Sequence, residues 1–330
     1  MWKWGAGIIV GIGMLWSGLW YYAQNQVDGA AVNFIFQEHK AGRDWSCDEL
    51  NRTGFPFSLF RLCSGSKLSS QAGEDLSLAK LQGIWTVFNP NSVLTEATAP
   101  LEFHFGTLRG SASWGHAETR FGGVITQNIR FDSAITALSG VIDAPEGSQA
   151  LQVEQFNLSL TPGTLKDKDN VLPVDLVLTG VKNPMLAQVF GTQDAVSLKL
   201  AGSMDHLDRS QAATLQQVLE QWRQKSGQIE ITHFELHAGE FNLNATGTLS
   251  LDDQHRLAGR LNAEVSGANG VLTNFGLSPK SSMVGKLISG ILSGKVENGK
   301  FKGAAVPLRF KDGQVLLGSI PLPLKLEPVY

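Results

Sequence analysis

The fold class follows from one stretch, residues 229–265, which reads IEITHFELHAGEFNLNATGTLSLDDQHRLAGRLNAEV. Apolar and polar residues alternate along it, and turn-forming residues interrupt the alternation at Gly239 and at 252–255. A period of two residues places one apolar face inward and one polar face outward, which is typical of an antiparallel sheet. The stretch therefore predicts a meander of at least three strands.

The apolar positions of this meander define a candidate groove. If the sheet curls without closing, these side chains line an open apolar surface, which is unusual for a soluble domain and implies a ligand or partner. If helices and other strands cover them, the same side chains are simply core. The candidate groove consists of Ile229, Ile231, Phe241, Leu243, Leu249, Leu257 and Leu261.

The same alternation extends outward in both directions from the meander. It predicts earlier strands near 76–88, 101–110, 118–131, 149–160, 171–179 and 194–201, with loops at 143–148 and 161–170. Towards the carboxyl end, Asp312-Gly313 lies between two apolar runs and predicts a hairpin with a type I′ turn.

In the β-rich part of the chain, residues 24–330, apolar residues have helical spacing in only two places. The first begins near Asp208, a suitable N-cap, and ends at Gly227; the second covers 281–293. Helices of this kind most often cover an open sheet. The fold class we expect is mainly β: one N-terminal transmembrane helix, then an elongated, curved antiparallel β-sheet domain with a few covering helices.

The transmembrane prediction rests on residues 5–23, which contain no charged side chain. A helix needs about 17–25 mostly apolar residues to cross a bilayer, and aromatic residues at both ends of the stretch suit the two interfaces. Lys3 precedes the stretch, so residues 1–4 should be cytoplasmic and residues 24–330 periplasmic, with a candidate sub-boundary near 203–228. The predicted location is the bacterial inner membrane, crossed once, with the bulk of the chain in the periplasm.

A cleaved signal peptide is the alternative reading of this stretch. Cleavage requires small residues before the cut, whereas Trp20, Tyr21 and Tyr22 are bulky. We therefore expect the stretch to stay attached as an anchor.

The composition of the chain limits which partners and which cysteine chemistry we expect. The formal net charge of −3 argues against a nucleic-acid partner, because neutralising phosphates requires a basic surface. Cys47 and Cys63 are the two cysteines of the chain, and an isolated pair in an exported protein usually forms a disulfide. Two free thiols or a metal-binding pair are the alternatives.

Motifs of catalysis are missing from the sequence. There is no nucleophile elbow of the GxSxG type and no complete phosphate-binding loop. His233 and His237 are four residues apart but fall on a predicted strand, without the surroundings of a helical zinc motif. We expect no enzymatic activity, no cofactor and no metal.

The segment CDELNRTGFPFSLFRLC, residues 47–63, carries the most specific motif of the chain. Its two cysteines flank Gly54, Phe55, Pro56 and Phe57. The segment resembles a proteobacterial family of unknown function, domain-of-unknown-function family 2125, whose members share this Cys…GFPF…Cys pattern after an N-terminal anchor. Physically, Gly54 permits a tight bend and Pro56 requires an edge or bulge, while the two phenylalanines, two residues apart, are placed to anchor the start of the sheet on one face.

A more distant resemblance links the meander and the closing IPLPL motif to AsmA-like periplasmic proteins. That resemblance implies a twisted sheet with an apolar groove and a role in lipid traffic. The expected function is a non-enzymatic, membrane-anchored envelope protein that binds or shields lipid acyl chains. The alternatives are a scaffold or chaperone-like protein that binds other envelope proteins through its sheet edges, and, weakest, a hydrolase.

Overall fold

The computed structural model describes the chain except for residues 1, 41, 71–72, 125–127, 146, 166–167, 208–214, 275–295, 298–299, 302–303 and 319. Its helices are α1 (Trp2–Lys40), α2 (Pro184–Phe190), α3 (Leu215–Gln224) and α4 (Asn269–Asn274). The first strands are β1 (Arg43–Thr53), β2 (Ser58–Ser70), β3 (Asp75–Thr86), β4 (Asn89–Phe105), β5 (Leu108–Ser113), β6 (His116–Gly122), β7 (Arg130–Ala144), β8 (Gly147–Leu160), β9 (Gly163–Leu165) and β10 (Lys168–Val181). The remaining strands are β11 (Val196–Met204), β12 (Ile229–Ala238), β13 (Phe241–Leu251), β14 (Leu257–Ser266), β15 (Val296–Glu297), β16 (Lys300–Phe301), β17 (Ala304–Lys311), β18 (Gln314–Leu317) and β19 (Ile320–Lys325).

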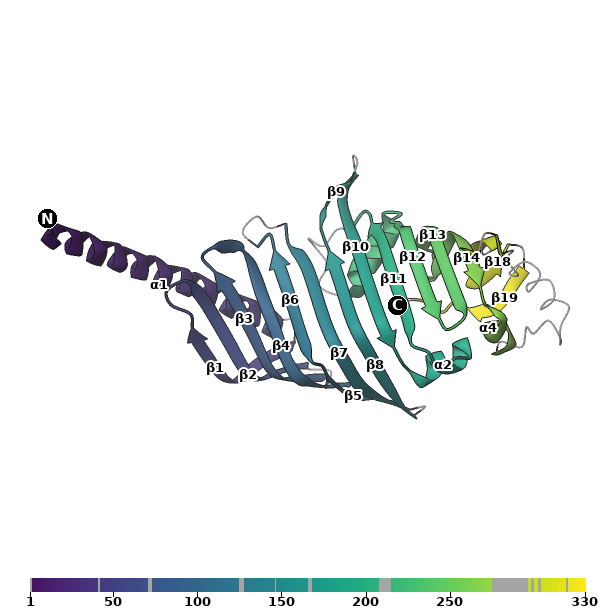
Figure 1. Cartoon of the computed structure of the whole chain (residues 1–330), viewed down its shortest axis with the longest axis horizontal. Coiled ribbons are helices and arrows are strands. Elements are labelled where there is room, and N and C mark those ends of the chain that lie inside the picture. The colour runs from purple at the N-terminus through teal and green to yellow at the C-terminus, as the bar shows by residue number, and fades with distance from the viewer. Residues whose placement is uncertain are drawn as a thin grey trace. The chain divides into compact units, whose positions relative to one another are not determined.

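The chain is mainly β and forms two compact units, whose elements are labelled in Figure 1. Unit 1 comprises Met1–Ile129 and Ala137–Ala150, and unit 2 comprises Arg130–Thr136 and Leu151–Tyr330. The candidate sub-boundary near 203–228 lies inside unit 2, in the connection between β11 and β12, which pair directly with each other.

Unit 1 is built around antiparallel pairing of β1, β2, β3 and β4 in chain order. The long strand β4 then pairs with β6 along its first half and with β5 along its second half. Helix α1 is held to this sheet by Asp28, which accepts hydrogen bonds from Arg61 at 3.0 Å and forms an ion pair with Arg52 at 3.4 Å.

The strands of unit 2 also pair in an antiparallel sheet. Their order is β8, β10, β11, β12, β13, β14, β17, β18 and β19, each antiparallel to the next. The meander predicted for residues 229–265 is confirmed as β12, β13 and β14. The predicted hairpin at Asp312-Gly313 is also confirmed, because both residues have positive φ (53° and 73°), as a type I′ turn requires.

One irregularity in β12 matters for the apolar face. The ladder to β13 passes from Ile231 opposite Gly247 to Phe234 opposite Ala245, so β12 contains one residue more than its neighbour over this interval. The hydroxyl of Thr232 donates to the carbonyl of Ala201 at 3.0 Å within this bulge. A bulge keeps apolar residues on one face although their spacing in the sequence changes from two to three.

The predicted anchor, residues 5–23, lies within α1, but the helix continues to Lys40. No helix in the part of the chain that the structure describes is long and apolar enough to cross a membrane. The last turns of residues 5–23 also contact the β1–β2 turn, since the indoles of Trp16 and Trp20 donate to the carbonyls of Pro56 (2.9 Å) and Ser58 (3.1 Å). The prediction of a transmembrane anchor is therefore not supported.

Other boundaries need correction. The strand predicted at 101–110 is interrupted by the turn at Gly106, whose φ is +60°, and the one predicted at 118–131 is divided between β6 and β7. The loop predicted at 161–170 contains β9 and the start of β10. Of the predicted helices, 215–224 is confirmed as α3, whereas Asp208 and 281–293 lie outside the described residues.

Helices α2 and α4 were not predicted. Asn183 caps α2, accepting from the backbone amides of Met185 and Leu186, and Gly191 ends it in the left-handed conformation. The two helices meet where Asn274 donates to the carbonyl of Gln188 at 2.6 Å.

Candidate functional site

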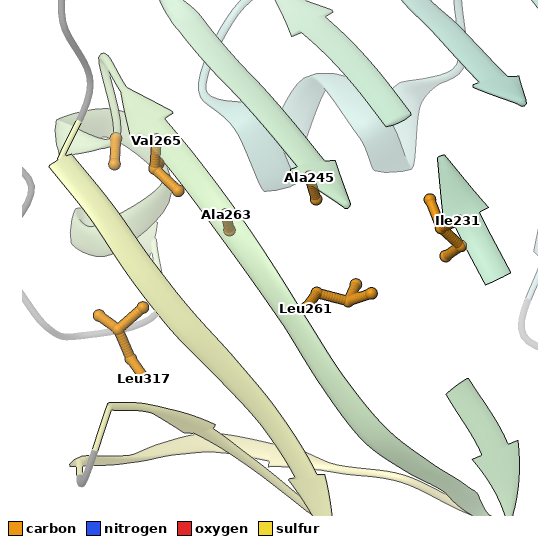
Figure 2. Packing of buried hydrophobic residues seen from close by; sticks show 7 residues of the cluster. Ile231, Ala245, Leu261, Ala263, Val265 and Leu317 are labelled. Carbon is orange, nitrogen blue, oxygen red and sulfur yellow. The ribbon is translucent and has the colours of Figure 1, made fainter. Parts of the chain in front are cut away.

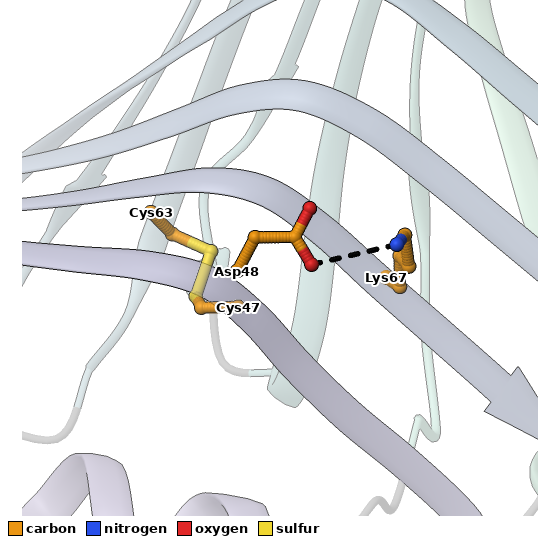
Figure 3. Close-up of a disulfide and its surroundings, with 4 residues drawn as sticks. All are labelled: Cys47, Asp48, Cys63 and Lys67. Atoms are coloured by element: carbon orange, nitrogen blue, oxygen red, sulfur yellow. Dashed lines mark hydrogen bonds and ion pairs between the residues drawn. A yellow bond between two sulfur atoms is a disulfide. The ribbon is translucent and has the colours of Figure 1, made fainter.

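The predicted disulfide is confirmed. Cys47 on β1 and Cys63 on β2 are bonded, with their Cα atoms 5.6 Å apart (Figure 3). Beside them, Lys67 donates to Asp48 at 3.4 Å across the same two strands. The bond replaces the alternatives of free thiols or a metal-binding pair, and it closes a loop that contains the GFPF motif. A loop of this size stabilises the fold by about 3 kcal/mol in the chain-entropy model.

The GFPF motif forms the turn between β1 and β2. Gly54 has a φ of +113°, and a Cβ atom at this position would collide with the carbonyl oxygen of Ser58. Only glycine fits both requirements. The motif is therefore a turn whose shape depends on its first residue.

The two phenylalanines of the motif lie differently from the expectation that they anchor the sheet from one face. Phe55 is 58% exposed and contacts the ring of Trp20 edge-on at 5.3 Å. Phe57 is 50% exposed and contacts Trp16 at 6.1 Å and Phe88 at 5.5 Å. The rings join α1 to two turns of the sheet, because the docked helix offers them aromatic partners outside the sheet face.

The candidate groove residues mostly form one cluster in unit 2, whose buried members are shown in Figure 2. Ile231 and Leu261 are buried in it, beside Ala245 and the fully buried Ala263. Four candidate residues pack against it half-buried: Ile229, Phe241, Leu243 and Leu249. Leu257 pairs with Leu251 at the start of β14, outside the cluster. The part of the face on β13 and β14 is thus core at its centre.

The same face continues onto strands that the candidate groove did not include. The register places Phe234 beside Leu200, Leu200 beside Leu176, and Leu176 beside Leu158. A parallel row joins Leu243, Leu236, Leu198 and Leu178. From β8 to β12 all of these leucines and Phe234 are half-buried, and Leu200 and Phe234 also pack against the buried cluster. On the same face Val196 and Ile231 are buried, as are Ala245 and Ala263 on β13 and β14. We call the part on β8, β10, β11 and β12 the open apolar face.

A cavity of about 680 Å³ also lies in unit 2, and its lining residues differ in chemistry from those of the open apolar face. Carboxylates, hydroxyls and small residues line it, among them Asp175, Asp205, Glu230, Ser203 and Thr248. Asp205 is occupied structurally, because it accepts from the backbone amide of Gln228 at 2.6 Å. The three carboxylates of the lining disfavour an acyl chain, because burying them beneath it would remove their water.

Titratable groups converge at one place that the sequence did not reveal. Glu220 on α3 accepts from Arg223 (2.8 Å) and from the hydroxyl of Tyr330 (2.8 Å), and the Tyr330 ring stacks on His255 at 4.5 Å. Hydrogen bonds from Arg223 and Tyr330 hold the pKa of Glu220 well below its usual value, while burial and then Glu220 raise the pKa of Tyr330. Glu220 and Tyr330 are 110 residues apart in the sequence, so no local sequence pattern predicts their contact. Each side chain of this cluster is engaged in holding separate segments of the chain together.

The histidines predicted to be unimportant for metal binding are exposed. His233 lies 3.5 Å from Glu235, and His237 is within 2.7 Å of the side chain of Asn242. Among the residues whose placement is described, no group of three or more metal-ligating side chains comes together.

Comparison with known proteins gives one match. The model of a family described as "Uncharacterized protein conserved in bacteria (DUF2125)" matches residues 20–324. No curated protein and no solved structure matches the chain. The AsmA-like resemblance receives no support from these comparisons.

Proposed function

Since the chain belongs to the DUF2125 family of uncharacterized bacterial proteins, we propose a function from its own surfaces: it binds lipid acyl chains on the open apolar face of unit 2 without catalysing a reaction. The observation that carries this proposal is the half-buried row of Leu158, Leu176, Leu200 and Phe234, each in register with the next.

The dimensions of the row suit an acyl chain. Neighbouring strands lie about 4.8 Å apart, so the row from β8 to β12 is about 14 Å long. That length is close to one leaflet of a hydrocarbon core about 30 Å thick. Large apolar side chains left half-buried along such a length favour an apolar ligand, because each gains about 1.5–3 kcal/mol from complete burial.

The disulfide supports an exported location. Disulfides persist in oxidising compartments such as the periplasm and are rare in the cytosol. We therefore place this activity in the periplasm. A binding role also agrees with the converging titratable groups around Glu220, which are all engaged in structural contacts.

Leu236→Arg tests the proposal. Leu236 lies between Leu198 and Leu243 on the open apolar face, and His237, its exposed neighbour on β12, provides the matched control His237→Arg. Lipid should be extracted from the purified full chain and quantified by mass spectrometry. We expect lipid with the wild type and with His237→Arg, and a folded Leu236→Arg protein that has lost at least about 80% of it, since a charge opposes acyl binding.

Two outcomes contradict the proposal. Wild-type protein that carries no lipid shows that the face is not a lipid site. A Leu236→Arg protein that fails to fold, while His237→Arg folds, shows that the face is closed core, because an unpaired buried charge collapses stability.

A further inference from the structure

We propose that one end of unit 1 docks onto the headgroup region of a phospholipid bilayer. We call this surface the aromatic end and define it as Trp16, Trp20, Phe55, Phe57 and Phe88. It is a different surface from the open apolar face of unit 2, and the inference does not depend on the function proposed there.

The five rings form two contacting groups, which α1 and the β1–β2 turn connect because each group has a ring on both. Trp20 contacts Phe55, Trp16 contacts Phe57, and Phe57 contacts Phe88, with centroids 5.3–6.1 Å apart. The backbone amide of Val87 donates to the carbonyl of Phe57 at 3.0 Å, which fixes the β1–β2 turn beside the β3–β4 turn. The surface is therefore held by hydrogen bonds between its turns as well as by ring contacts.

The surface exposes a large apolar area. Phe55, Phe57 and Phe88 are 58%, 50% and 79% exposed. At about 150–250 Å² for each aromatic side chain, these three expose roughly 300–450 Å². That is the size of the largest apolar patch on a typical soluble protein, which is often functional.

Every chain segment that meets here is free of charge. Among the residues that the structure describes, 13–27, 53–60, 81–95 and 121–124 contain no Asp, Glu, Lys or Arg. The last of these reaches the β3–β4 turn through Gly123, whose amide donates to the carbonyl of Asn91 at 2.8 Å. A charge-free surface avoids the cost of moving ionised groups away from water into a membrane.

The opposite end of the same strands has the reverse character. There Glu102, His104, Arg109 and Asp143 line a shallow cavity of about 470 Å³, and Glu38 pairs with Arg43 where α1 ends and β1 begins. Unit 1 thus has one uncharged aromatic end and one charged end. This polarity along the strands matches the polarity of a bilayer surface, with the charged end in water.

Ring chemistry favours a bilayer over a protein groove. Tryptophan and tyrosine concentrate at headgroup level because their rings are amphipathic. The indole N–H groups of Trp16 and Trp20 already donate to Pro56 and Ser58, so they need no further partner as the rings enter a less polar phase. The phenylalanines stand on turns, so they can enter the interface without exposing unpaired strand edges to lipid.

The test is flotation of the full-length chain with phosphatidylcholine vesicles. We expect the double variant Phe57→Ser, Phe88→Ser to lower the partition coefficient at least about tenfold, because two exposed rings no longer leave water on binding. The matched control is Phe105→Ser. Phe105 is also exposed but ends β4, which begins directly after Phe88 and is 17 residues long, so the two residues are about 55 Å apart along the strand. The control should bind vesicles within twofold of the wild type.

Three results would overturn the inference. They are wild-type binding by the double variant, an equal loss with Phe105→Ser, and a wild-type dimer in sedimentation velocity that the double variant dissociates without any vesicle binding. The last identifies a second copy of the chain as the occupant. If the double variant fails to fold, Phe88→Ser alone carries the test, since this ring is the most exposed of the three. Lipid extraction, which depends on Leu236, distinguishes failure here from failure of the proposed function.

Discussion

Replacing Trp222 with alanine should destabilise unit 2 by about 3–5 kcal/mol. Trp222 lies on α3 and is 1% exposed. Its indole N–H donates to the carbonyl of Asp205 at 2.8 Å, at the end of β11, so one side chain holds the connection between β11 and β12. Truncating a buried tryptophan removes its transfer free energy and leaves a cavity, and the two together account for that range.

The contributions of the hydrogen bond and of the apolar ring of Trp222 to stability can be measured separately. Trp222→Phe keeps most of the apolar surface but removes the indole N–H that donates to the Asp205 carbonyl, which should cost about 1–3 kcal/mol. Gly227 allows a second substitution that tests the same contact, because a Cβ atom there would collide with the indole ring of Trp222. Gly227→Ala should therefore cost about 1–3 kcal/mol by overpacking in the wild type.

In the Trp222→Ala background the same glycine substitution should cost much less, because the ring that it meets is gone. The expected coupling energy between the two sites is about 1–2 kcal/mol. Urea unfolding of the four proteins, followed by circular dichroism, measures the cycle, with hydrogen exchange of the β11 and β12 amides assigning the loss to unit 2. Additive effects within about 0.3 kcal/mol would refute the described contact.

Three shorter predictions follow from unit 1 and from the Glu220 cluster. Gly54→Ala should destabilise by about 1–3 kcal/mol in urea unfolding, whereas Gly73→Ala, also at positive φ but in open space, should cost less; equal costs would contradict the collision at Gly54. Because its folded pKa is depressed, Glu220 should contribute stability that is present at neutral pH and lost as pH falls through the folded pKa, so Glu220→Gln should flatten the acid limb of a stability–pH curve, and an unchanged limb would tell against this. Thiol labelling of denatured, unreduced protein should detect neither Cys47 nor Cys63, and labelling of both would end the disulfide assignment.

Local alternation explains what the sequence could predict. The β12–β14 meander and the Asp312-Gly313 hairpin depend on neighbours a few residues apart, and both were predicted correctly. The strand expected at 101–110 was wrong because the turn at Gly106 interrupts an otherwise continuous pattern. Alternation reports which residues share a face, not where the face is covered.

The candidate site illustrates that limit. Leu243 and Leu261 were predicted to share one face, with groove and core as open alternatives; the first is half-buried and the second buried, since burial depends on what covers each strand. The half-buried continuation of the face lies on strands whose register with β12 no local pattern specifies. The aromatic end was missed for the same reason, because Trp16 meets Phe57 across 41 positions of sequence.

The bulge in β12 has a consequence for insertions and deletions. Removing Thr232 or His233 would leave Ile229, Ile231 and Phe234 in unbroken alternation and equalise the residue count with β13. Removing a residue elsewhere in the middle of β12 would turn part of the strand over, because a one-residue slip exchanges the two faces. Positions 232 and 233 are therefore the places in β12 where a natural deletion of one residue would leave every apolar side chain on its present face.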